Sequence, residues 1–314
     1  MKTILISGGC GFVGTQLINK LINKYKIISV DTKWFGDYLP KNKNLLNIKD
    51  DIANIEKYKI NKIDCVIHLA SVANDPMALI DKNLSWETSA LNTMKLLEYL
   101  KKTKTKRFIY ASSGSVYGIK KENNVKEDLE LNPISIYNKV KMVTERVILS
   151  YQKHFNIFIV RPATICGFSK RMRLDLTVNA LTFSALKNKI VNVYGGQQIR
   201  PNIHIDDMCD LYQFFINTKK GNAGIYNAGF ENLSIINIAK LIQKQIPCKI
   251  NIIKGTNDPR SYRLDSSKIL QLGFYPKKTI NDAVKELKDL YCQKKLINKD
   301  SYNSLKWLQK KLKK

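Results

Sequence analysis

The segment that decides the fold spans residues 4–14 and reads ILISGGCGFVG. A short apolar run leads into three glycines, Gly8, Gly11 and Gly14, and a helical pattern follows directly. Glycines at this spacing let the chain turn tightly, let backbone N–H groups approach a pyrophosphate, and let the helix pack close to the strand. The N-terminus of that helix also favours an anion. The segment therefore predicts a dinucleotide-binding strand–turn–helix unit.

An acidic residue closes the next apolar run and indicates which dinucleotide binds. Asp31 ends the second predicted strand, where such folds place a carboxylate against the adenosine ribose, and Thr32 follows it. A carboxylate repels a 2′-phosphate, so the sequence predicts NAD rather than NADP as the cofactor. Asp51 and Ile52 fall at the end of a third predicted strand, a suitable place to contact adenine.

Apolar runs and helical patterns continue to alternate beyond the glycine segment. Buried strands are predicted at residues 4–7, 27–30, 65–69, 107–111 and 157–160. Helices are predicted at residues 14–24, 86–101 and 136–151. This alternation indicates a parallel sheet with helices on both faces. The predicted fold class is α/β, a Rossmann-type doubly wound parallel sheet with a smaller C-terminal α/β lobe.

The regularity weakens after Pro162, which suggests a division of the chain. We predict an NAD-binding Rossmann domain at residues 1–166, to which the chain returns at about 200–218. Residues 167–298 form a substrate-binding lobe in this interpretation. A basic tail follows at residues 299–314, expected to be a packed or frayed helix, with a membrane-surface helix as the less favoured alternative.

The chain is strongly basic, with 53 lysine and arginine residues against 26 acidic ones and a formal net charge of +27. Such a charge can indicate a nucleic-acid or membrane partner. The lysines are spread along the whole chain, however, and no recognised nucleic-acid-binding motif accompanies them. We therefore expect no nucleic-acid partner, and we expect the charge to attract a diphosphate.

The cysteines, the histidines and the apolar runs indicate the compartment in which the protein works. The six cysteines are scattered and the three histidines lie far apart, so reduced thiols and no metal site are expected. No apolar run approaches the ~20 residues that cross a bilayer. The chain opens on a strand-like segment rather than on a signal peptide. We expect a cytoplasmic protein without stable membrane insertion.

A tyrosine and a lysine form the candidate catalytic pair. Tyr137 and Lys141 lie four residues apart, on one face of the predicted helix. A phenol has a reference pKa of about 10, and a neighbouring ammonium is expected to lower it. Ser113 lies in the segment YASSGSVYG at residues 110–118, just beyond a predicted strand. Such loops bind ligands in α/β sheets, so Ser113 is predicted to share a proton with Tyr137.

Several motifs occur together in one order. They are GGCGFVG (8–14), Asp31, Asp51-Ile52, HLAS (68–71), Asn92, SSGSVYG (112–118), YNKVK (137–141), RPATICG (161–167) and RPNIHIDD (200–207). Over about residues 2–290 the chain resembles the extended short-chain dehydrogenases/reductases of the NAD-dependent epimerase/dehydratase family. The resemblance implies the same fold, NAD as cofactor and a nucleotide-sugar substrate. It also implies a homodimer in which the helix carrying Tyr137 packs against its counterpart.

The resemblance assigns roles to individual residues. Ser113, Tyr137 and Lys141 would be catalytic, and Asn92 would support the surroundings of the lysine. The residues implied to bind NAD are Gly8, Gly11, Phe12, Val13, Gly14, Asp31, Thr32, Asp51, Ile52, Leu69, Ala70, Ser71, Asn92, Tyr137, Lys141 and Pro162. Those implied to bind the substrate are Ser113, Ser115, Asn179, Arg200 and Arg260, with the two guanidinium groups clamping the diphosphate. His204 is expected to be structural.

The reaction is narrowed by two residues after the catalytic serine. Family members that remove water usually carry an Asp-Glu pair there, whereas this chain has Gly114 and Ser115, so 4,6-dehydration is not expected. We favour a 4-epimerase, with a hexose or heptose 4-dehydrogenase or 4-ketoreductase as the alternative. Residues 169–179 resemble members from surface-polysaccharide sugar pathways. A non-catalytic NAD- or nucleic-acid-binding relative is the remote alternative, which the intact Ser-Tyr-Lys set opposes.

Overall fold

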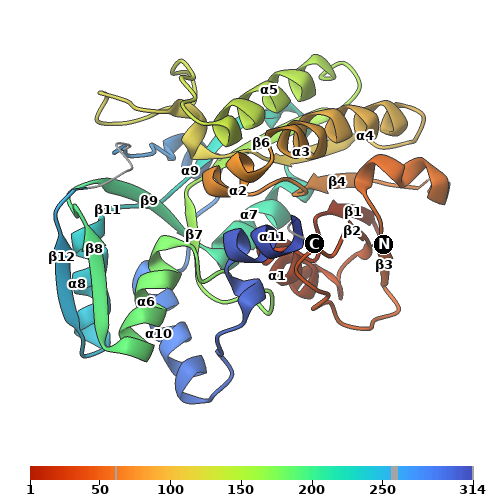
Figure 1. Ribbon diagram of the computed structural model, residues 1–314. Helices are drawn as coiled ribbons and strands as arrows, with labels where there is room; N and C mark the ends of the chain where they lie inside the picture. Colours follow the sequence, from red (N-terminus) through yellow and green to blue (C-terminus); the bar gives the residue numbers. More distant parts are fainter. Residues whose placement is uncertain (61, 256–260, 313–314) are drawn as a thin grey trace.

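A seven-stranded sheet forms the centre of the molecule (Figure 1). The computed structural model describes residues 1–60, 62–255 and 261–312. The strand order is β10-β6-β5-β4-β1-β2-β3, and every neighbouring pair is parallel. The strands are β1 (Thr3–Ser7), β2 (Lys26–Asp31), β3 (Leu45–Lys49), β4 (Cys65–His68), β5 (Arg107–Ala111), β6 (Asn156–Pro162) and β10 (Gly224–Ala228). This arrangement confirms the predicted α/β, Rossmann-type fold.

The strand order reverses between β1 and β4, and the chain runs outward from there in both directions. In open parallel sheets, ligands bind at the carboxyl ends of the strands at such a reversal. The glycine segment follows β1, and the segment that begins at Leu69 follows β4. The topology therefore brings residues 8–14 and 69–71 together at one edge of the sheet.

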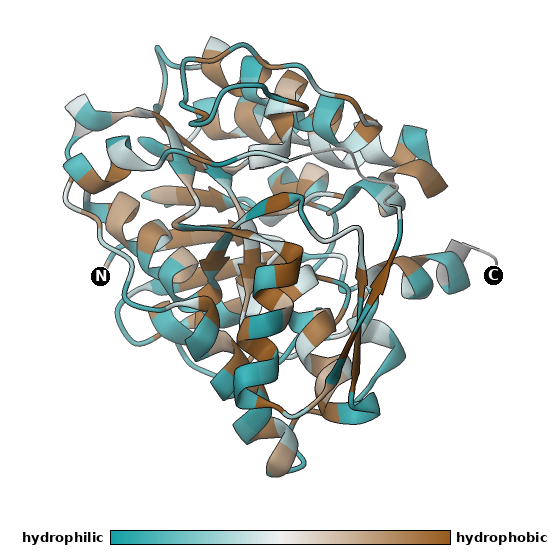
Figure 2. Ribbon diagram, turned by 90° about the vertical axis from the view of Figure 1, so that its left-hand side faces the viewer, coloured by the Kyte–Doolittle hydropathy of each residue, from teal (hydrophilic) through white to brown (hydrophobic). Residues whose placement is uncertain are grey.

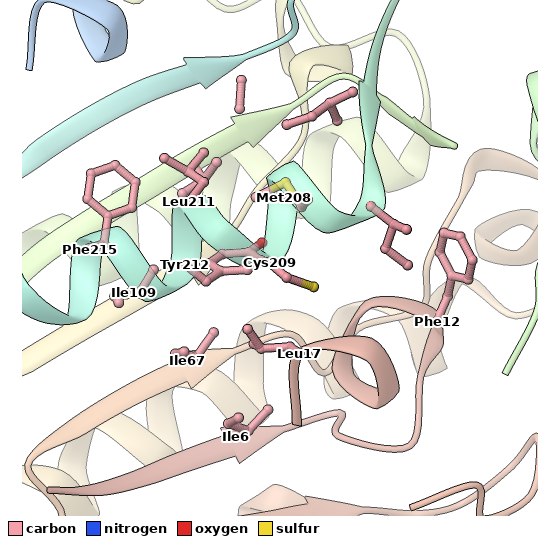
Figure 3. Packing of buried hydrophobic residues seen from close by; sticks show 14 of the residues in the cluster. Ile6, Phe12, Leu17, Ile67, Ile109, Met208, Cys209, Leu211, Tyr212 and Phe215 are labelled. Carbon is pink, nitrogen blue, oxygen red and sulfur yellow. The ribbon is translucent and has the colours of Figure 1, made fainter. Parts of the chain in front are cut away.

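Successive side chains of each strand point to opposite faces of the sheet, so the sheet has two apolar faces. A layer of helices covers each of them. Ile6, Ile67 and Ile109 belong to a cluster that includes the helices α1 (Phe12–Leu21) and α7 (Ile205–Asn217). Figure 3 shows the α7 side chains over these three residues, notably Tyr212. Leu5, Val66 and Phe108 point to the other face, against α4 (Asn92–Lys101). The helix α5 (Ile136–Ser150) packs beside α4.

The helix predicted at residues 86–101 is interrupted in the structure. A short helix α3 (Lys82–Trp86) is followed by a π-helical turn η2 (Glu87–Leu91) and then by α4. Shorter elements on this side are η1 (Ile52–Tyr58), α2 (Asp75–Ile80) and η3 (Gly114–Tyr117). A single π turn inside a helix shifts the register of the side chains that follow it, which periodicity in the sequence does not reveal.

The second half of the chain adds two small sheets and their helices. The strands β7 (Thr164–Cys166), β9 (Ile199–His204) and β11 (Glu231–Ser234) form one sheet, and β8 (Ile190–Tyr194) and β12 (Lys249–Ile253) form the other. The helices α6 (Thr177–Asn188), α8 (Ile235–Gln245) and α10 (Ile280–Cys292) share a separate apolar core. Figure 2 shows hydrophobic strands and helices with hydrophilic outer sides in this region. Two further short elements are η4 (Lys220–Asn222) and α9 (Ser267–Gln271).

Two segments of residues 200–228 belong to the large sheet rather than to this second core. The helix α7 covers one face of the sheet, and it lies within residues 200–218, where the chain was predicted to return. The strand β10 was not predicted, and it pairs with β6 as the last strand of the sheet. Its short sequence GIYNA carries no strong alternation of apolar and polar residues.

The basic tail folds back onto the body of the molecule. It forms the turn η5 (Asp300–Tyr302) and the helix α11 (Ser304–Leu312), which lies against α2. Leu308 is buried in a cluster with Met77 and Ala78, and the indole N–H of Trp307 donates to the Trp34 carbonyl oxygen at 2.6 Å. The tail is therefore packed. Within the described residues, no helix combines the length and apolar composition needed to cross a membrane.

Candidate active site

A cavity of about 500 Å³ opens at the carboxyl ends of the central strands. Its wall contains most of the residues that the sequence singled out. They are Gly8, Gly11, Phe12, Val13, Gly14, Asp31, Thr32, Asp51, Ile52, Leu69, Ala70, Ser71, Ser113, Ser115, Tyr137, Lys141, Pro162 and Arg200. Asn92 and Asn179 are not part of the wall. Arg260 lies outside the described residues.

The glycine loop is shaped as a cradle that larger residues could not form. Gly8 has a φ of +73°, and a Cβ there would lie 2.7 Å from the Ala70 backbone nitrogen. A Cβ on Gly14 would lie 2.3 Å from the Gly8 carbonyl oxygen. Both positions therefore require glycine, for close packing of the loop on the chain after β4 and on the first turn of α1. The space left at the N-terminus of α1 fits a pyrophosphate.

The Asp31 carboxylate at the end of β2 is tied to the glycine loop. Its oxygens accept hydrogen bonds from the backbone N–H of Cys10 at 3.0 Å and of Lys33 at 2.6 Å. Burial raises the pKa of Asp31, although these two donors oppose the shift. The carboxylate thus stands in the cavity wall where an adenosine ribose would lie, and it excludes additional negative charge.

Replacing Asp31 with asparagine is expected to narrow the preference for NAD over NADP. The substitution removes the negative charge that repels a 2′-phosphate and keeps one acceptor oxygen for the loop. We expect the ratio of the two dissociation constants to fall by roughly tenfold or more, since 1.4 kcal/mol corresponds to a factor of ten. Calorimetric titration of both cofactors into the variant measures this ratio. An unchanged ratio would remove Asp31 from the account of cofactor choice.

Asp51 organises the adjacent part of the wall together with Asn92. One Asp51 oxygen accepts from the Ala53 backbone N–H at 2.9 Å and caps η1, and the same oxygen accepts from the Asn92 amide at 2.9 Å. The resemblance implied that Asn92 supports the surroundings of Lys141. In the structure its side-chain amide donates a hydrogen bond to the Asp51 carboxylate. Its direct contact with NAD stays a prediction.

Ser113 and Tyr137 lie together at the other end of the cavity. Ser135 caps the N-terminus of α5, which presents Tyr137 in the first turn of the helix. Tyr137 and Ser113 are hydrogen-bonded, and the Ser113 and Ser115 hydroxyl oxygens lie 2.7 Å apart. The Ser115 hydroxyl donates to the Asn138 side-chain oxygen at 2.7 Å. This chain of hydroxyls fixes the Ser113 side chain beside Tyr137.

The charge state of Tyr137 differs from the sequence-based prediction. Burial raises the pKa of its phenol to about 12, and the hydrogen bond with Ser113 only partly opposes this. The prediction that Lys141 lowers the tyrosine's pKa is therefore wrong for the protein alone. The Lys141 nitrogen lies 5.9 Å from the centroid of the Tyr137 ring. The neutral phenol is therefore the favoured form of Tyr137 in the protein alone.

Lys141 lies one turn further along α5 and is almost fully buried. Its Nζ donates to the Ala111 carbonyl oxygen at 2.7 Å, at the end of β5. Burial lowers the pKa of its ammonium to about 7, although the negative charge of Glu145 opposes the shift. Burial therefore disfavours the charged form of Lys141, and keeping this amine at the cavity wall costs stability.

Replacing Lys141 with methionine is expected to abolish hydride transfer and to stabilise the cofactor-free protein. At pH 7 we expect the free energy of unfolding to rise by roughly 0.5–2 kcal/mol, the usual gain when a functional group of this kind is removed. The folded-state pKa is lower than the unfolded value, so the unfolded chain binds more protons between about pH 7 and 10.5. The wild type therefore gains stability as pH rises through this window. Urea denaturation at pH 7 and pH 10 should show the difference between the two proteins shrinking, and a constant difference would contradict this.

A buried ion pair lies directly beneath these residues. The Arg161 guanidinium donates to the two Glu145 oxygens at 3.0 and 2.7 Å, and Ser112 donates to the same carboxylate. Arg161 also donates to the Tyr117 hydroxyl at 2.8 Å. Glu145 lies on α5 one turn after Lys141, and Ser112 immediately precedes Ser113. The Glu145 carboxylate, through Arg161 and Ser112, thus joins the helix that carries Lys141 to the loop that carries Ser113.

The residues predicted to hold the substrate diphosphate have different surroundings. Arg200 lines the cavity, and its guanidinium donates to the Ile199 carbonyl oxygen at 3.1 Å. Asn179 is buried in α6, where its side chain accepts from the Gly167 N–H at 3.0 Å and donates to the Arg173 carbonyl oxygen at 3.1 Å. Asn179 therefore holds the loop after β7 in place, and its contact with a diphosphate stays a prediction.

His204 has the structural role that was expected. It is buried at the N-terminus of α7, where its Nδ1 accepts from the Asp206 backbone N–H at 3.1 Å. Its ring lies outside the cavity wall.

Several cavity residues were not singled out from the sequence. They are Asp75, Thr88, Arg171, Arg173, Tyr262 and Ser304, among others. The two arginines lie in the basic loop at residues 168–175, so the charge of that loop was the available signal. Within the described parts of the chain, no group of three or more His, Cys, Asp or Glu side chains is placed to hold a metal ion.

The sequence model of the NAD dependent epimerase/dehydratase family matches residues 4–229 of this chain. The chain belongs to this family. A putative UDP-glucose 4-epimerase of Methanocaldococcus jannaschii is 28% identical over 304 residues, which cover 90% of this chain and 96% of the relative. UDP-glucuronic acid decarboxylase 1 of Danio rerio is 27% identical over 294 residues, covering 88% and 69% of the two chains.

Solved structures support the same assignment. A point mutant of UDP-glucuronic acid 4-epimerase from Bacillus cereus, in complex with UDP-4-deoxy-4-fluoro-glucuronic acid and NAD, is 28% identical to this chain. It superposes with a TM-score of 0.83 over 93% of this chain and 99% of its own. Members of the family are NAD-dependent enzymes on nucleotide sugars, and the chain is an extended short-chain dehydrogenase/reductase. The binding of NAD by the glycine cradle and Asp31 stays a prediction. The relatives carry out different reactions, and the family alone does not choose among them.

Proposed function

We propose that this enzyme is an NAD-dependent 4-epimerase of a nucleotide-diphosphate sugar. The observation that carries the proposal is the placement of Ser113, Tyr137 and Lys141 in the same cavity as the glycine cradle and Asp31. Arg200, in the same wall, offers a guanidinium to a diphosphate. One cavity thus contains groups suited to the cofactor, to a proton transfer and to an anionic substrate.

The side chains divide the chemistry between them. Tyr137, hydrogen-bonded to Ser113, exchanges a proton with the hydroxyl at C4, and the Ser113 hydroxyl orients that oxygen. The Lys141 ammonium favours the phenolate when Tyr137 gives up its proton. When bound, NAD supplies the hydride acceptor and, in its oxidised form, a positive charge in the cavity. The proton taken from the C4 hydroxyl would return from Tyr137 to the ketone oxygen when the hydride returns, which would complete an epimerisation.

The segment after Ser113 supports this choice over removal of water. Gly114 and Ser115 occupy the positions where an acid and a base would be needed, and the Ser115 hydroxyl is bound to Ser113 and Asn138. A Cβ on Gly114 would lie 2.9 Å from a Leu264 methyl group, so a larger residue there would require the Leu264 side chain to move. Oxidation and reduction at C4 need only the three catalytic residues and NAD.

A panel of nucleotide sugars tests the proposal. Purified enzyme is mixed with NAD and with UDP-, GDP-, CDP- and dTDP-sugars of hexoses and heptoses, and absorbance at about 340 nm is followed alongside product analysis. A C4-inverted product without net NADH is the expected result. Stoichiometric NADH with one sugar would instead identify the 4-dehydrogenase, or the 4-ketoreductase working in reverse.

We infer further that the enzyme is a cytoplasmic homodimer in surface-polysaccharide sugar biosynthesis. Support for a dimer comes from the helix α4, beside α5, where Leu91 and Met94 leave 45% and 42% of their surfaces exposed at its start. Apolar side chains of this size are typical of buried subunit interfaces. All six cysteines are free thiols, in keeping with a reducing compartment. Light scattering coupled to gel filtration measures the oligomeric state.

A further inference from the structure

Arg171 is a buried cation that has no ion-pair partner among the described residues. Only 2% of its surface is exposed, and the described ion pairs do not include it. Its guanidinium donates to the Met172 carbonyl oxygen at 3.3 Å and to the Ser304 hydroxyl at 2.8 Å, while its Nε–H has no hydrogen-bond partner in the described part of the chain. A buried charge normally requires an opposite charge nearby. Burial, together with repulsion from Arg173, accordingly lowers the pKa of Arg171 to about 9.

The neighbouring carboxylate, that of Asp175, is paired with Arg173 rather than with Arg171. Asp175 forms two parallel hydrogen bonds with Arg173, each 3.0 Å long. Arg171 instead lies over the ring of Phe35, with its central carbon 4.0 Å from the ring centroid. Stacking on an aromatic face orients a guanidinium but leaves its N–H groups for another acceptor. The arrangement therefore holds Arg171 in position without neutralising it.

The position of Arg171 matches the adenosine half of the cofactor. Phe35 belongs to the segment that follows β2, and Arg171 is close enough to Asp31 for their charges to attract. In sheets of this topology the carboxyl end of β2 holds the adenosine side of a dinucleotide. Tyr137 and Ser113, at the far end of the cavity, mark the nicotinamide side. Arg171 thus lines the same cavity as the glycine cradle, beside the segment that follows β2.

The C-terminal segment holds the Arg171 side chain in place through Ser304. Ser304, the first residue of α11, accepts its hydrogen bond, and the Ser304 backbone N–H lies 3.3 Å from an Asp175 oxygen. The Tyr302 carbonyl accepts from the Leu174 N–H at 2.8 Å. Trp307 is bonded to the Trp34 carbonyl of the segment after β2. Residues 302–307 therefore join the basic loop to the adenosine side of the cavity, and Figure 1 shows α11 between the two halves of the molecule.

We propose that Arg171, held by Ser304, is a cofactor-binding residue that places its guanidinium on the diphosphate of the adenosine half of NAD. The diphosphate then lies between the N-terminus of α1 on one side and Arg171 on the other. The C-terminal helix is part of the cofactor site in this arrangement. The inference concerns the cofactor alone, so it holds for whichever sugar and reaction the enzyme serves.

Cofactor titrations in the absence of any sugar test this proposal. Arg171→Gln is expected to weaken binding of NAD and of ADP-ribose by roughly ten- to a hundred-fold, as loss of charge-assisted hydrogen bonds does. Ser304→Ala keeps the charge but releases its anchor, and is expected to weaken both by roughly two- to tenfold. The matched control is Arg146→Gln, which removes the same charge from the exposed side of α5 and should leave both dissociation constants unchanged.

The titrations are run on protein whose circular dichroism and thermal transition match those of the wild type. If Arg171→Gln does not fold, the Ser304→Ala titration decides alone. Unchanged binding of NAD and ADP-ribose in the folded variants would overturn the proposal. Weaker binding of UDP with unchanged binding of NAD would also overturn it, because Arg171 would then belong to the nucleotide-sugar half of the cavity.

Discussion

Replacing Tyr137 with phenylalanine is expected to lower the rate of hydride transfer by roughly a hundred- to ten-thousand-fold, the range that general acid–base catalysis contributes. The phenol is the group hydrogen-bonded to Ser113 in the cavity, and phenylalanine keeps its volume but cannot exchange a proton. The glycine cradle and Asp31 are untouched, so NAD binding should remain as in the wild type. Stopped-flow absorbance at about 340 nm measures the rate, and calorimetry measures the binding.

The matched control removes a phenol from the surface. Tyr151 follows α5 immediately, and its hydroxyl donates to Glu98 at 2.6 Å on the outside of the molecule. Tyr151→Phe should leave both hydride transfer and NAD binding unchanged. Turnover of Tyr137→Phe at the wild-type rate would eliminate the proposed proton transfer, whereas a joint loss of NAD binding would indicate damage to the fold.

Replacing Arg161 with methionine is expected to lower the free energy of unfolding by roughly 3–5 kcal/mol. The substitution leaves the Glu145 carboxylate buried without its guanidinium, and it removes a donor from the Tyr117 hydroxyl. Glu145 and Arg161 are both nearly inaccessible to water, so solvent does not screen the pair. Urea denaturation followed by circular dichroism measures the change.

The double variant Arg161→Met with Glu145→Met is the control. Replacing both members of a buried ion pair with apolar residues is often neutral, so we expect it to recover most of the lost stability. The double variant also removes the carboxylate to which Ser112 donates. Because Ser112 immediately precedes Ser113, we expect hydride transfer to be slower even where the fold is restored. A single variant within about 1 kcal/mol of the wild type would show that the pair contributes little to stability.

Residues close together in the sequence explain which parts of the site could be predicted. The cofactor cradle is built by one strand–turn–helix segment, and the requirement for glycine at Gly14 follows from contacts with Gly8 and Gly9 inside that segment. Tyr137 and Lys141 share a helix face because they lie four residues apart on α5. Asp31 is placed by the end of β2. In each case a local element fixes the position of the side chain.

Contacts between distant segments explain what could not be predicted. Arg171 meets Asp31 and Ser304 only because three separate parts of the chain converge on the cavity. The amide of Asn92 reaches Asp51 across the interval between β3 and α4. The pKa of Tyr137 was predicted in the wrong direction because the extent of burial is a tertiary property, and burial is the largest cause of the shift. No spacing in the sequence encodes these effects.

The central claim is that one bound NAD removes the C4 hydride of a nucleotide sugar and returns it to the other face. It is tested most directly with the sugar found in the panel, labelled with deuterium at C4, in a single turnover with the NAD-loaded enzyme. The account predicts transient absorbance at about 340 nm, a C4-inverted product and deuterium retained at C4. A C4-inverted product formed without that absorbance, and with its deuterium lost to water, would contradict it.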